Sequence, residues 1–363
     1  MKVGIVGLPN VGKSTLFNCL SQNKAQSENY PFCTIDPNIS IVNVPDIRLD
    51  KLSFLIKPQK LTPTTVKIVD IAGLVKGASK GEGLGNKFLS NIRETDAIIH
   101  VLRCFDDPNI VHVDGKINPL SDKEVVEYEL TLKDIEIIEK RLEKIKKNLR
   151  SGSSETKKEI EILEKVLLQL ENMSIDRYEY SDDQFEDYIK PLDLISFKPI
   201  LYVCNVGEGD IISGNNYVED VKKEVENKDS EIIIISAKIE SEINELESFE
   251  EKKIFLDDLG LEESGSNKLI RASYKLLNLH SYFTAGEKEV RGWTVKIGDS
   301  AYDAAGQIHT DFQKGFICAE VISYDDYVEY GSELKVKEAG KMKLEGKDYI
   351  VSDGDIMHFR FNI

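Results

Sequence analysis

The chain has few cysteines and lacks long apolar runs. Its 363 residues include five cysteines, odd in number and without a C-x-x-C pair: Cys19, Cys33, Cys104, Cys204 and Cys318. This usage is typical of reduced thiols and argues against a disulfide framework or a zinc site. No stretch approaches the length of a membrane span, and polar residues end the apolar N-terminus too early for a signal peptide. We therefore expect a soluble, cytoplasmic protein.

The chain also has fewer basic than acidic residues. Lys and Arg number 47 against 64 Asp and Glu, which gives a formal net charge of −17. An acidic chain is not attracted as a whole to nucleic acid or to an anionic membrane, although a local basic face is compatible with this total. We expect neither a membrane partner nor a DNA partner, and we expect a monomer.

Short apolar runs alternate with helical or irregular stretches along most of the chain. The strand candidates are residues 2–6, 39–44, 66–71, 97–102, 200–204 and 232–236. Strands that alternate with helices indicate an α/β protein with a mainly parallel sheet covered on both faces. The length of the chain suggests two or three domains.

The segment from about 120 to 195 departs from this alternation. Apolar residues recur there at spacings of three and four in two stretches, which a Ser-Gly-Ser-Ser turn at 151–154 separates. They are Ile135, Ile138, Leu142, Ile145 and Leu149, then Ile160, Leu163, Leu167 and Leu170. This pattern predicts an inserted antiparallel helical hairpin, a short coiled coil whose seams pack on each other. A protruding hairpin is also able to touch a partner.

The composition changes again from Gly292 onward. Strand candidates surround one helix candidate at about 300–308, which predicts a compact α+β module of about seventy residues. The strand candidates are residues 294–297, 316–321, 348–351 and 358–362. We place the domain boundary between residues 277 and 278, so that the expected domains are 1–277, with the insertion, and 278–363.

The strongest motif is G-L-P-N-V-G-K-S-T, which fits G-x-x-x-x-G-K-[S/T] and lies between a predicted strand and a predicted helix. In such a P-loop, successive backbone N–H groups and the helix N-terminus point at phosphate oxygens. Lys13 is expected to reach the β- and γ-phosphates, and the Ser14 hydroxyl to bind Mg²⁺. The nucleotide-binding residues expected here are Asn10, Val11, Gly12, Lys13, Ser14 and Thr15.

A second motif, D-I-A-G, follows the apolar run V-K-I-V. Asp70 is expected in the outer shell of the magnesium, and the Gly73 N–H at the γ-phosphate. Between the two motifs, Thr34 in N-Y-P-F-C-T-I-D-P-N is the candidate Mg²⁺ ligand that senses a triphosphate. The competing threonines, which lie just before the Asp70 strand, are Thr62, Thr64 and Thr65.

The group that orients the attacking water is less clearly marked. Leu74 stands where signalling GTPases carry a water-orienting Gln, so intrinsic hydrolysis is slow or uses another group. The glycines that follow Leu74 indicate a loop free to rearrange with the nucleotide. His112, just past the strand at 97–102, is either a water-positioning group or an ordinary loop histidine. Asn10 either binds a monovalent cation between the phosphates or supports the P-loop.

The loop expected to contact the base reads C-N-V-G-E where a GTPase would carry Asn-Lys-x-Asp. Guanine presents two donors that an Asp carboxylate accepts, whereas adenine presents an acceptor at N1. Glu208 at the Asp position is longer and less suited to guanine, Val206 offers apolar cover, and Asn205 keeps an amide that bridges to the P-loop or the base. Ser236-Ala237-Lys238 closes the other side of the base. With these residues, the loop lacks the hydrogen-bonding pattern that selects guanine. They do not by themselves establish a preference for adenine, because Glu208 reaches guanine if the loop shifts.

Together these motifs resemble the YchF / Obg-like ATPase family, nearly end to end. The N-terminal half carries G-L-P-N-V-G-K-S-T-L-F-N, N-Y-P-F-C-T-I-D-P-N, V-P-D-I-R-L-D-K-L and D-I-A-G-L-V-K-G-A-S. In the C-terminal half, H-T-D-F-Q-K-G-F-I-C-A-E-V and D-G-D-I-M-H-F-R-F-N resemble the family's TGS domain, a β-grasp fold. The resemblance implies hydrolysis of ATP in preference to GTP, association with the ribosome or its RNA, and K⁺ stimulation of turnover. It also supports His112 as a catalytic-loop residue.

Three other functions compete with a nucleotide-state switch that hydrolyses ATP. The nearest is an Obg-type GTPase switch. The second is a docking protein that binds through the C-terminal module and the hairpin, with hydrolysis incidental. A P-loop kinase is more distant, because no phosphoacceptor site or lid is recognisable in the sequence.

Overall fold

The computed structural model describes residues 1–22, 38–71, 90–113, 115–147, 154–226 and 230–362. The chain forms two compact units, each made of segments that are distant in sequence. The first unit consists mainly of residues 1–19 and 68–266, and the second mainly of residues 40–67 and 267–363. The four described cysteines are free. Among the described helices, none is long and apolar enough to cross a membrane.

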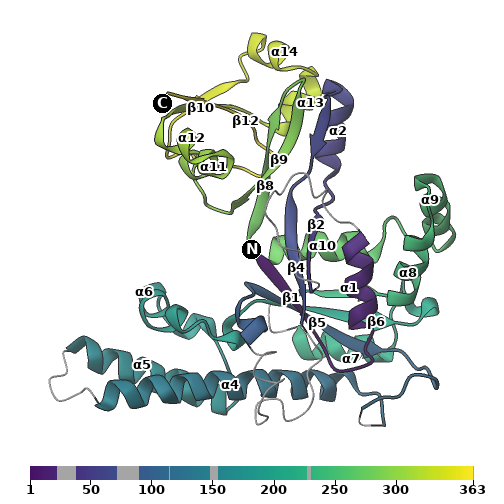
Figure 1. Ribbon diagram of the computed structural model, residues 1–363, viewed down its shortest axis with the longest axis vertical. Coiled ribbons are helices and arrows are strands. Elements are labelled where there is room, and N and C mark those ends of the chain that lie inside the picture. The colour runs from purple at the N-terminus through teal and green to yellow at the C-terminus, as the bar shows by residue number, and fades with distance from the viewer. Residues whose placement is uncertain (23–37, 72–89, 114, 148–153, 227–229, 363) are drawn as a thin grey trace. The chain divides into compact units, whose positions relative to one another are not determined.

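A six-stranded sheet forms the core of the first unit, in the order β2-β4-β1-β5-β6-β7 (Figure 1). Its strands are β1 Lys2–Val6, β2 Ile39–Asn43, β4 Thr65–Asp70, β5 Ala97–Cys104, β6 Ile200–Val206 and β7 Ile232–Ile235. The pairs β1–β5, β5–β6 and β6–β7 are parallel. All eight residues of β5 are buried, as in a strand covered on both faces. All six strand candidates in this part of the sequence are confirmed.

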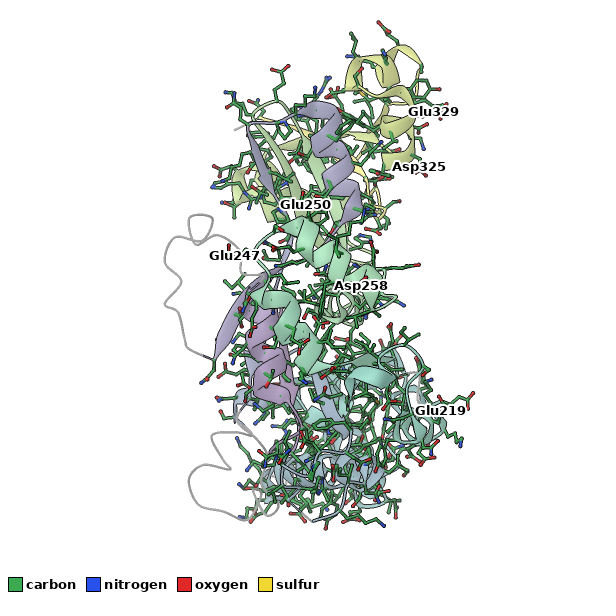
Figure 2. All side chains as sticks on the ribbon, turned by 90° about the vertical axis from the view of Figure 1, so that its right-hand side faces the viewer. Glu219, Glu247, Glu250, Asp258, Asp325 and Glu329 are labelled. Atoms are coloured by element: carbon green, nitrogen blue, oxygen red, sulfur yellow. The ribbon has the colours of Figure 1, made fainter. Side chains whose placement is uncertain are left out.

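Helix α1 Lys13–Gln22 follows β1, α7 Asn216–Val225 connects β6 to β7, and α8 Ala237–Glu245 follows β7. Two further helices come next in the chain, α9 Phe249–Asp258 and α10 Gly265–Leu276. In Figure 2 the labelled carboxylates Glu247, Glu250 and Asp258 lie on and around α9. No residue of α9 is buried, so this helix presents its acidic side chains to solvent.

The predicted helical hairpin is present as α4 Pro119–Lys147 and α5 Ser154–Glu171 (Figure 1). Its seam buries Ile138, Leu142 and Ile145 of α4 with Leu163, Val166 and Leu170 of α5. The ion pairs Arg141–Glu159 and Lys146–Glu164 flank that seam at 2.6 Å each. Short helical segments, among them α6 Asp182–Gln184, lead back to β6. The spacing of apolar residues therefore predicted the hairpin and most of its seam, but it missed Ile162 and Val166. The predicted Ile135, Ile160 and Leu167 are partly buried against the seam, and Leu149 lies outside the described residues.

A second six-stranded sheet, in the order β11-β10-β12-β8-β9-β3, organises the second unit. The strands are β3 Lys60–Thr62, β8 Leu279–Ala285, β9 Glu289–Lys296, β10 Phe316–Ile322, β11 Lys343–Glu345 and β12 Ile356–Phe361. The pairs β8–β9, β10–β12 and β10–β11 are antiparallel, whereas β12–β8 and β3–β9 are parallel. The accompanying helices are α2 Ile47–Ile56, α11 Ala301–Ile308, α12 Thr310–Lys314, α13 Tyr324–Tyr330 and α14 Glu333–Glu338.

Most of the expected C-terminal elements are found, with two corrections. The helix at 300–308 and the strands at 316–321 and 358–362 correspond to α11, β10 and β12. The expected strand at 348–351 is wrong, because only Ile350 forms an isolated bridge, to Ser300. Around that bridge, the Val351 N–H donates to the Asp299 carbonyl and the Ala301 N–H to the Tyr349 carbonyl, whereas the Tyr349 N–H closes a turn on the Gly346 carbonyl. The strand at 294–297 is the end of a longer β9, and β8 precedes it.

Residues 40–67 contribute α2 and β3 to the second unit, which the sequence did not predict. Asp46 caps α2 by accepting from the Arg48 N–H, and Leu49 and Leu52 of α2 are buried in a core with Phe283. Strand β3 pairs with β9 at the register Lys60 to Glu289. Between β2 and β4, the chain thus contributes one helix to the second unit and one edge strand, β3, to its sheet.

Candidate functional site

The P-loop joins the end of β1 to the start of α1 and has the backbone that its glycines permit. Gly12 adopts a φ of +94°, and Asn10 a φ of 64°, a left-handed conformation that Asn tolerates. At Gly7, a Cβ atom would lie 2.7 Å from the Val101 carbonyl oxygen, so only glycine fits there. The Gly12 carbonyl accepts from the Leu16 N–H, which starts α1. This is the backbone conformation that lets a P-loop present its amides to phosphate oxygens.

Asn205 connects the P-loop to the loop that follows β7. Its Nδ2 donates to the Val11 carbonyl oxygen at 2.8 Å, and its Oδ1 accepts from the Ala237 N–H at 2.9 Å. The side chain is buried, and a Cβ atom at Gly12 would lie 2.2 Å from its Nδ2. The Asn205 side chain thus brings together residues predicted from separate motifs, namely Val11, Gly12 and Ala237. The bridge to the P-loop expected of Asn205 is present.

Lys13 and Asp70 form an ion pair at the ends of α1 and β4. Both side chains are largely buried, and Ser14, next in the chain, is exposed. The Ser14 hydroxyl and the Asp70 carboxylate are hard oxygen donors of the kind that Mg²⁺ takes, so these residues fit a magnesium ion. Thr34, Gly73 and Leu74 lie outside the described residues.

Two of the three threonines that compete with Thr34 as magnesium ligands make contacts elsewhere. The Thr62 hydroxyl donates to Glu289 Oε1 at 2.6 Å within the second unit. Thr64 is buried there too, against Gly292. These contacts give Thr62 and Thr64 structural roles. The third competitor, Thr65, is the first residue of β4, and Thr34 stays a prediction.

His112 lies at the end of a loop that contacts the P-loop. Asn10 Nδ2 donates to the carbonyl oxygen of Val111, the residue before His112, at 3.1 Å. This contact supports the interpretation of Asn10 as a structural residue. His112 Nε2 lies 3.0 Å from Asp122 Oδ2, and both residues are buried. Asp122 is one of several carboxylates near the start of α4, and only the fold distinguishes it from the others.

At the base loop, Glu208 and Lys238 form an ion pair across the site. The Glu208 carboxylate raises the pKa of Lys238 through this hydrogen bond. Val206 was expected to cover the base, but it is 2% exposed and packs with Cys204, Val218 and Val221 in the core. Alternate residues of a strand face the same side, so Val206 shares the inward face of Tyr202 and Cys204 on β6.

These elements define a P-loop nucleoside triphosphatase. Residues 2–148 match the family model "50S ribosome-binding GTPase", and residues 279–362 match the YchF-GTPase_C model, described as "Protein of unknown function (DUF933)". The chain is 54% identical to the "Ribosome-binding ATPase YchF" of Haemophilus ducreyi and 52% identical to that of Bacillus subtilis, covering 100% of the chain and 99% and 100% of those proteins. It therefore belongs to the YchF family.

Solved structures agree with this assignment. The YchF GTPase of Schizosaccharomyces pombe matches with a TM-score of 0.89 and 39% identity, over 99% of this chain and 97% of that one. A GTP-binding protein from Pyrococcus horikoshii matches at a TM-score of 0.61 and 21% identity, over 100% of both chains, which shows the fold alone. The predicted class, a P-loop α/β unit with a helical hairpin and a further α+β module, is confirmed.

Proposed function

We propose that this chain is a Mg²⁺-dependent ATPase that prefers ATP to GTP and acts as a nucleotide-state switch on the ribosome. The name shared by its relatives supports both ATP hydrolysis and ribosome binding. We further propose that it is a cytoplasmic monomer with domains at 1–277 and 278–363, and that K⁺ stimulates its turnover.

The observation that carries the base preference is the Glu208–Lys238 ion pair. To read guanine, the Glu208 carboxylate would have to leave Lys238 and accept from the N1–H and the 2-amino group. Adenine has no such pair of donors, so it binds without a hydrogen bond to this carboxylate. A site whose polar groups are already satisfied in this way loses its hydrogen-bonding advantage for guanine.

The residues of the P-loop supply the phosphate site. Its amides and the N-terminus of α1 hold the phosphates, and Lys13 moves from Asp70 to the β- and γ-phosphates when the nucleotide binds. Ser14 and Asp70, with Thr34 from the switch segment, would hold the magnesium, which neutralises phosphate charge when bound. The Gly73 N–H would meet the γ-phosphate, so Thr34 and Gly73 report the nucleotide state.

Hydrolysis needs a group to orient water, because Leu74 has no polar atom on its side chain. His112 is the candidate, since the contact between Asn10 and Val111 holds the end of its loop against the P-loop. A neutral imidazole accepts a hydrogen bond from water at one nitrogen while the other nitrogen donates.

The test is to measure Kd and turnover for ATP and GTP, with and without ribosomes and K⁺. We expect tighter binding and faster turnover with ATP, and faster turnover when ribosomes or K⁺ are added. Glu208→Asp combined with Lys238→Met frees a carboxylate of the length that guanine readers use, so this variant should gain GTP affinity. Tight GTP binding with weak ATP binding in the wild type would overturn the proposal. A Lys13→Ala chain that binds no nucleotide yet replaces the wild type in cells would favour the docking function instead.

A further inference from the structure

Residues 105–112 form the first part of the connection between β5 and α4, the first helix of the insertion. Side chains from three separate elements hold this loop: Arg103 at the end of β5, Asn10 in the P-loop and Asp122 in the first turn of α4. Specific polar contacts from Arg103 therefore hold residues 105–110, and contacts from Asn10 and Asp122 hold the two residues that follow.

Arg103 holds the first part of the loop. Its side chain is 1% exposed and donates to the carbonyl oxygens of Phe105, Asp107 and Ile110 at 3.2, 3.2 and 3.0 Å. Its guanidinium carbon also lies 4.7 Å from the centre of the Phe105 ring. Buried charges are retained only when they are well hydrogen-bonded, and here main-chain carbonyls of one loop supply those bonds. The Arg103 side chain thus fixes the conformation of the backbone that leads to His112.

Asp122 holds the last part of the loop through the imidazole itself. The carboxylate is an acceptor, so the hydrogen bond at 3.0 Å places the proton of a neutral ring on Nε2. The lone pair of that ring is then on Nδ1. Both partners are buried, and this shields their hydrogen bond from competition with solvent.

We propose that Asp122 is the positioning residue of His112: it fixes the tautomer and the orientation that His112 needs to orient the attacking water. This inference rests on the role of His112 in the proposed function. It also connects the insertion to hydrolysis. Asp122 belongs to the 29-residue helix α4, whose other end carries the hairpin seam. Such a helix is about 44 Å long, so a displacement of the hairpin reaches the imidazole through one rigid element.

The first test reads the tautomer directly. The chain has five histidines, so spectra of protein labelled with ¹⁵N in histidine are assignable by substituting each histidine in turn. For the neutral form of the ring, we expect His112 of the wild type to show the shifts of the single tautomer with the proton on Nε2. Asp122→Ala should give averaged shifts of both tautomers. Averaged shifts in the wild type, or unchanged shifts in Asp122→Ala, would overturn the proposal whether or not the chain hydrolyses ATP.

The second test measures kcat, KM and ATP affinity together. Asp122→Asn keeps the size of the side chain and removes its charge, and we expect kcat to fall about 10- to 100-fold while the Kd for ATP stays within about twofold. Asp122→Glu should restore part of kcat. Because both residues act on the same step, His112→Ala combined with Asp122→Asn should be no slower than His112→Ala alone, within about twofold.

Asp134→Asn is the matched control on the same helix. Asp134 is fully buried and accepts from the N–H groups of Ile195 and Ser196, away from His112. Its substitution should lower stability and leave kcat at the wild-type value. An equal fall in kcat for Asp134→Asn and Asp122→Asn would assign the effect to damage in α4 and overturn the proposal.

The outcomes separate this inference from the proposed function. If His112→Ala slows hydrolysis and Asp122→Asn does not, the positioning role is wrong and the role of His112 stands. If His112→Ala hydrolyses at the wild-type rate, the catalytic role of His112 fails and the positioning inference fails with it. If the wild type prefers GTP but Asp122→Asn slows GTP hydrolysis as described, only the base preference fails.

Discussion

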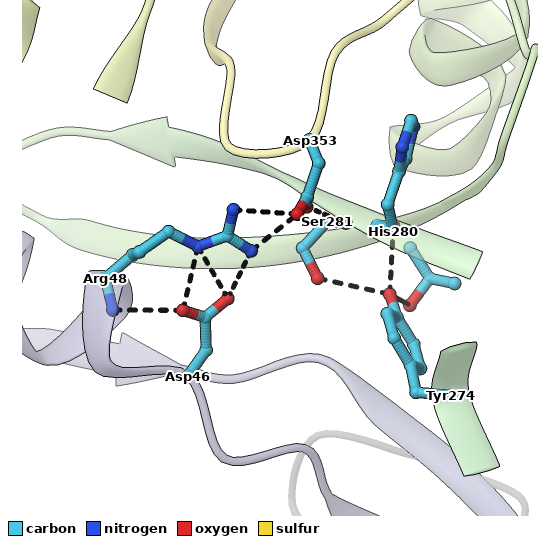
Figure 3. A network of polar contacts seen from close by, with 7 residues as sticks. Asp46, Arg48, Tyr274, His280, Ser281 and Asp353 are labelled. Atoms are coloured by element: carbon cyan, nitrogen blue, oxygen red, sulfur yellow. Dashed lines mark hydrogen bonds and ion pairs between the residues drawn. The ribbon is translucent and has the colours of Figure 1, made fainter. Parts of the chain in front are cut away.

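Arg48 and Asp353 are 305 residues apart in the sequence and are joined by two contacts of 3.0 Å (Figure 3). The same guanidinium also binds Asp46, the cap of α2, at 2.8 Å and lies 5.3 Å from the centre of the Phe283 ring. Asp353 in turn accepts from the Ser281 N–H of β8. Arg48 thereby fastens the N-terminus of α2 to the β8 strand and to the turn before β12.

Replacing Arg48 with Ala should lower the free energy of unfolding by about 1–3 kcal/mol, because two carboxylates lose one shared partner in a half-buried site. Arg48→Lys should recover only part of this loss, since an ammonium cannot bind both carboxylates with a planar fork. Urea denaturation measures both values.

The control for Arg48 is Lys341→Ala, in the same unit. Lys341 pairs with Asp326 at 3.5 Å in a more exposed position. Its loss should cost less than about 0.5 kcal/mol. Equal effects of the two substitutions would contradict the role given to Arg48.

Acid should destabilise the first unit through His100. This histidine is buried on β5 beside Tyr202, and its Nε2 has no hydrogen-bond partner among the described residues. Burial lowers the pKa of His100 from 6.5 to about 4, with a smaller upward effect from Glu127 and a downward one from Lys123. Between those two values the unfolded chain takes up a proton that the folded chain does not, so stability falls as the pH falls. The loss should reach ~2 kcal/mol by pH 5.

His100→Leu should abolish this part of the pH dependence, and it should be neutral or stabilising at pH 7.5 because it removes a buried polar atom without a partner. His309, which is well exposed, provides the control His309→Leu. The measurement is urea denaturation at pH 7.5 and pH 5. If His100→Leu and the wild type lose the same free energy on acidification, this assignment is wrong.

The sequence was sufficient for features that depend on local chemistry. The P-loop, the strands of the first sheet and the seam of the hairpin each follow from spacings within about ten residues. Asp122 and Arg103 could not be found in this way, because nothing in the sequence tells which carboxylate meets a given imidazole or which arginine folds under a loop. The position of α2 and β3 depends on pairing with β9, which no local pattern encodes. The prediction that Val206 covers the base failed because the strand was expected to end at Cys204, whereas β6 continues through Val206.

Nucleotide binding should protect the protein from unfolding through Lys13. With Mg²⁺–ATP at 100 times its Kd, the free energy of unfolding should rise by about 2.7 kcal/mol. EDTA should remove much of this gain, because Ser14 and Asp70 then have no metal through which to act on the phosphates. Lys13→Ala should show no gain at all, whereas Lys146→Ala, which disrupts an exposed ion pair of the hairpin, should show all of it. A thermal shift in Lys13→Ala as large as in the wild type would contradict this assignment.

The pair Glu208–Lys238 should control base selection even as a single substitution. Lys238→Met leaves the Glu208 carboxylate without its cation, so GTP affinity should rise relative to ATP affinity. Glu208→Gln removes the negative charge and should lower GTP affinity further while ATP affinity stays near the wild-type value. Competition between labelled ATP and unlabelled GTP gives both ratios. Unchanged ratios in both variants would show that this pair has no part in reading the base.

The pairing of β3 with β9 has a consequence for how the protein is made. Thr62 of β3 and Glu289 at the start of β9 are 227 residues apart, so β3 leaves the ribosome long before its neighbour is translated. At about 5–20 residues per second, that interval is roughly 10–45 s. Throughout it, the apolar side of α2, with Leu49 and Leu52, has no C-terminal sheet to pack against. A nascent chain of this protein therefore carries an unfinished second unit until its last hundred residues emerge, and premature termination within the first unit leaves α2 and β3 permanently exposed.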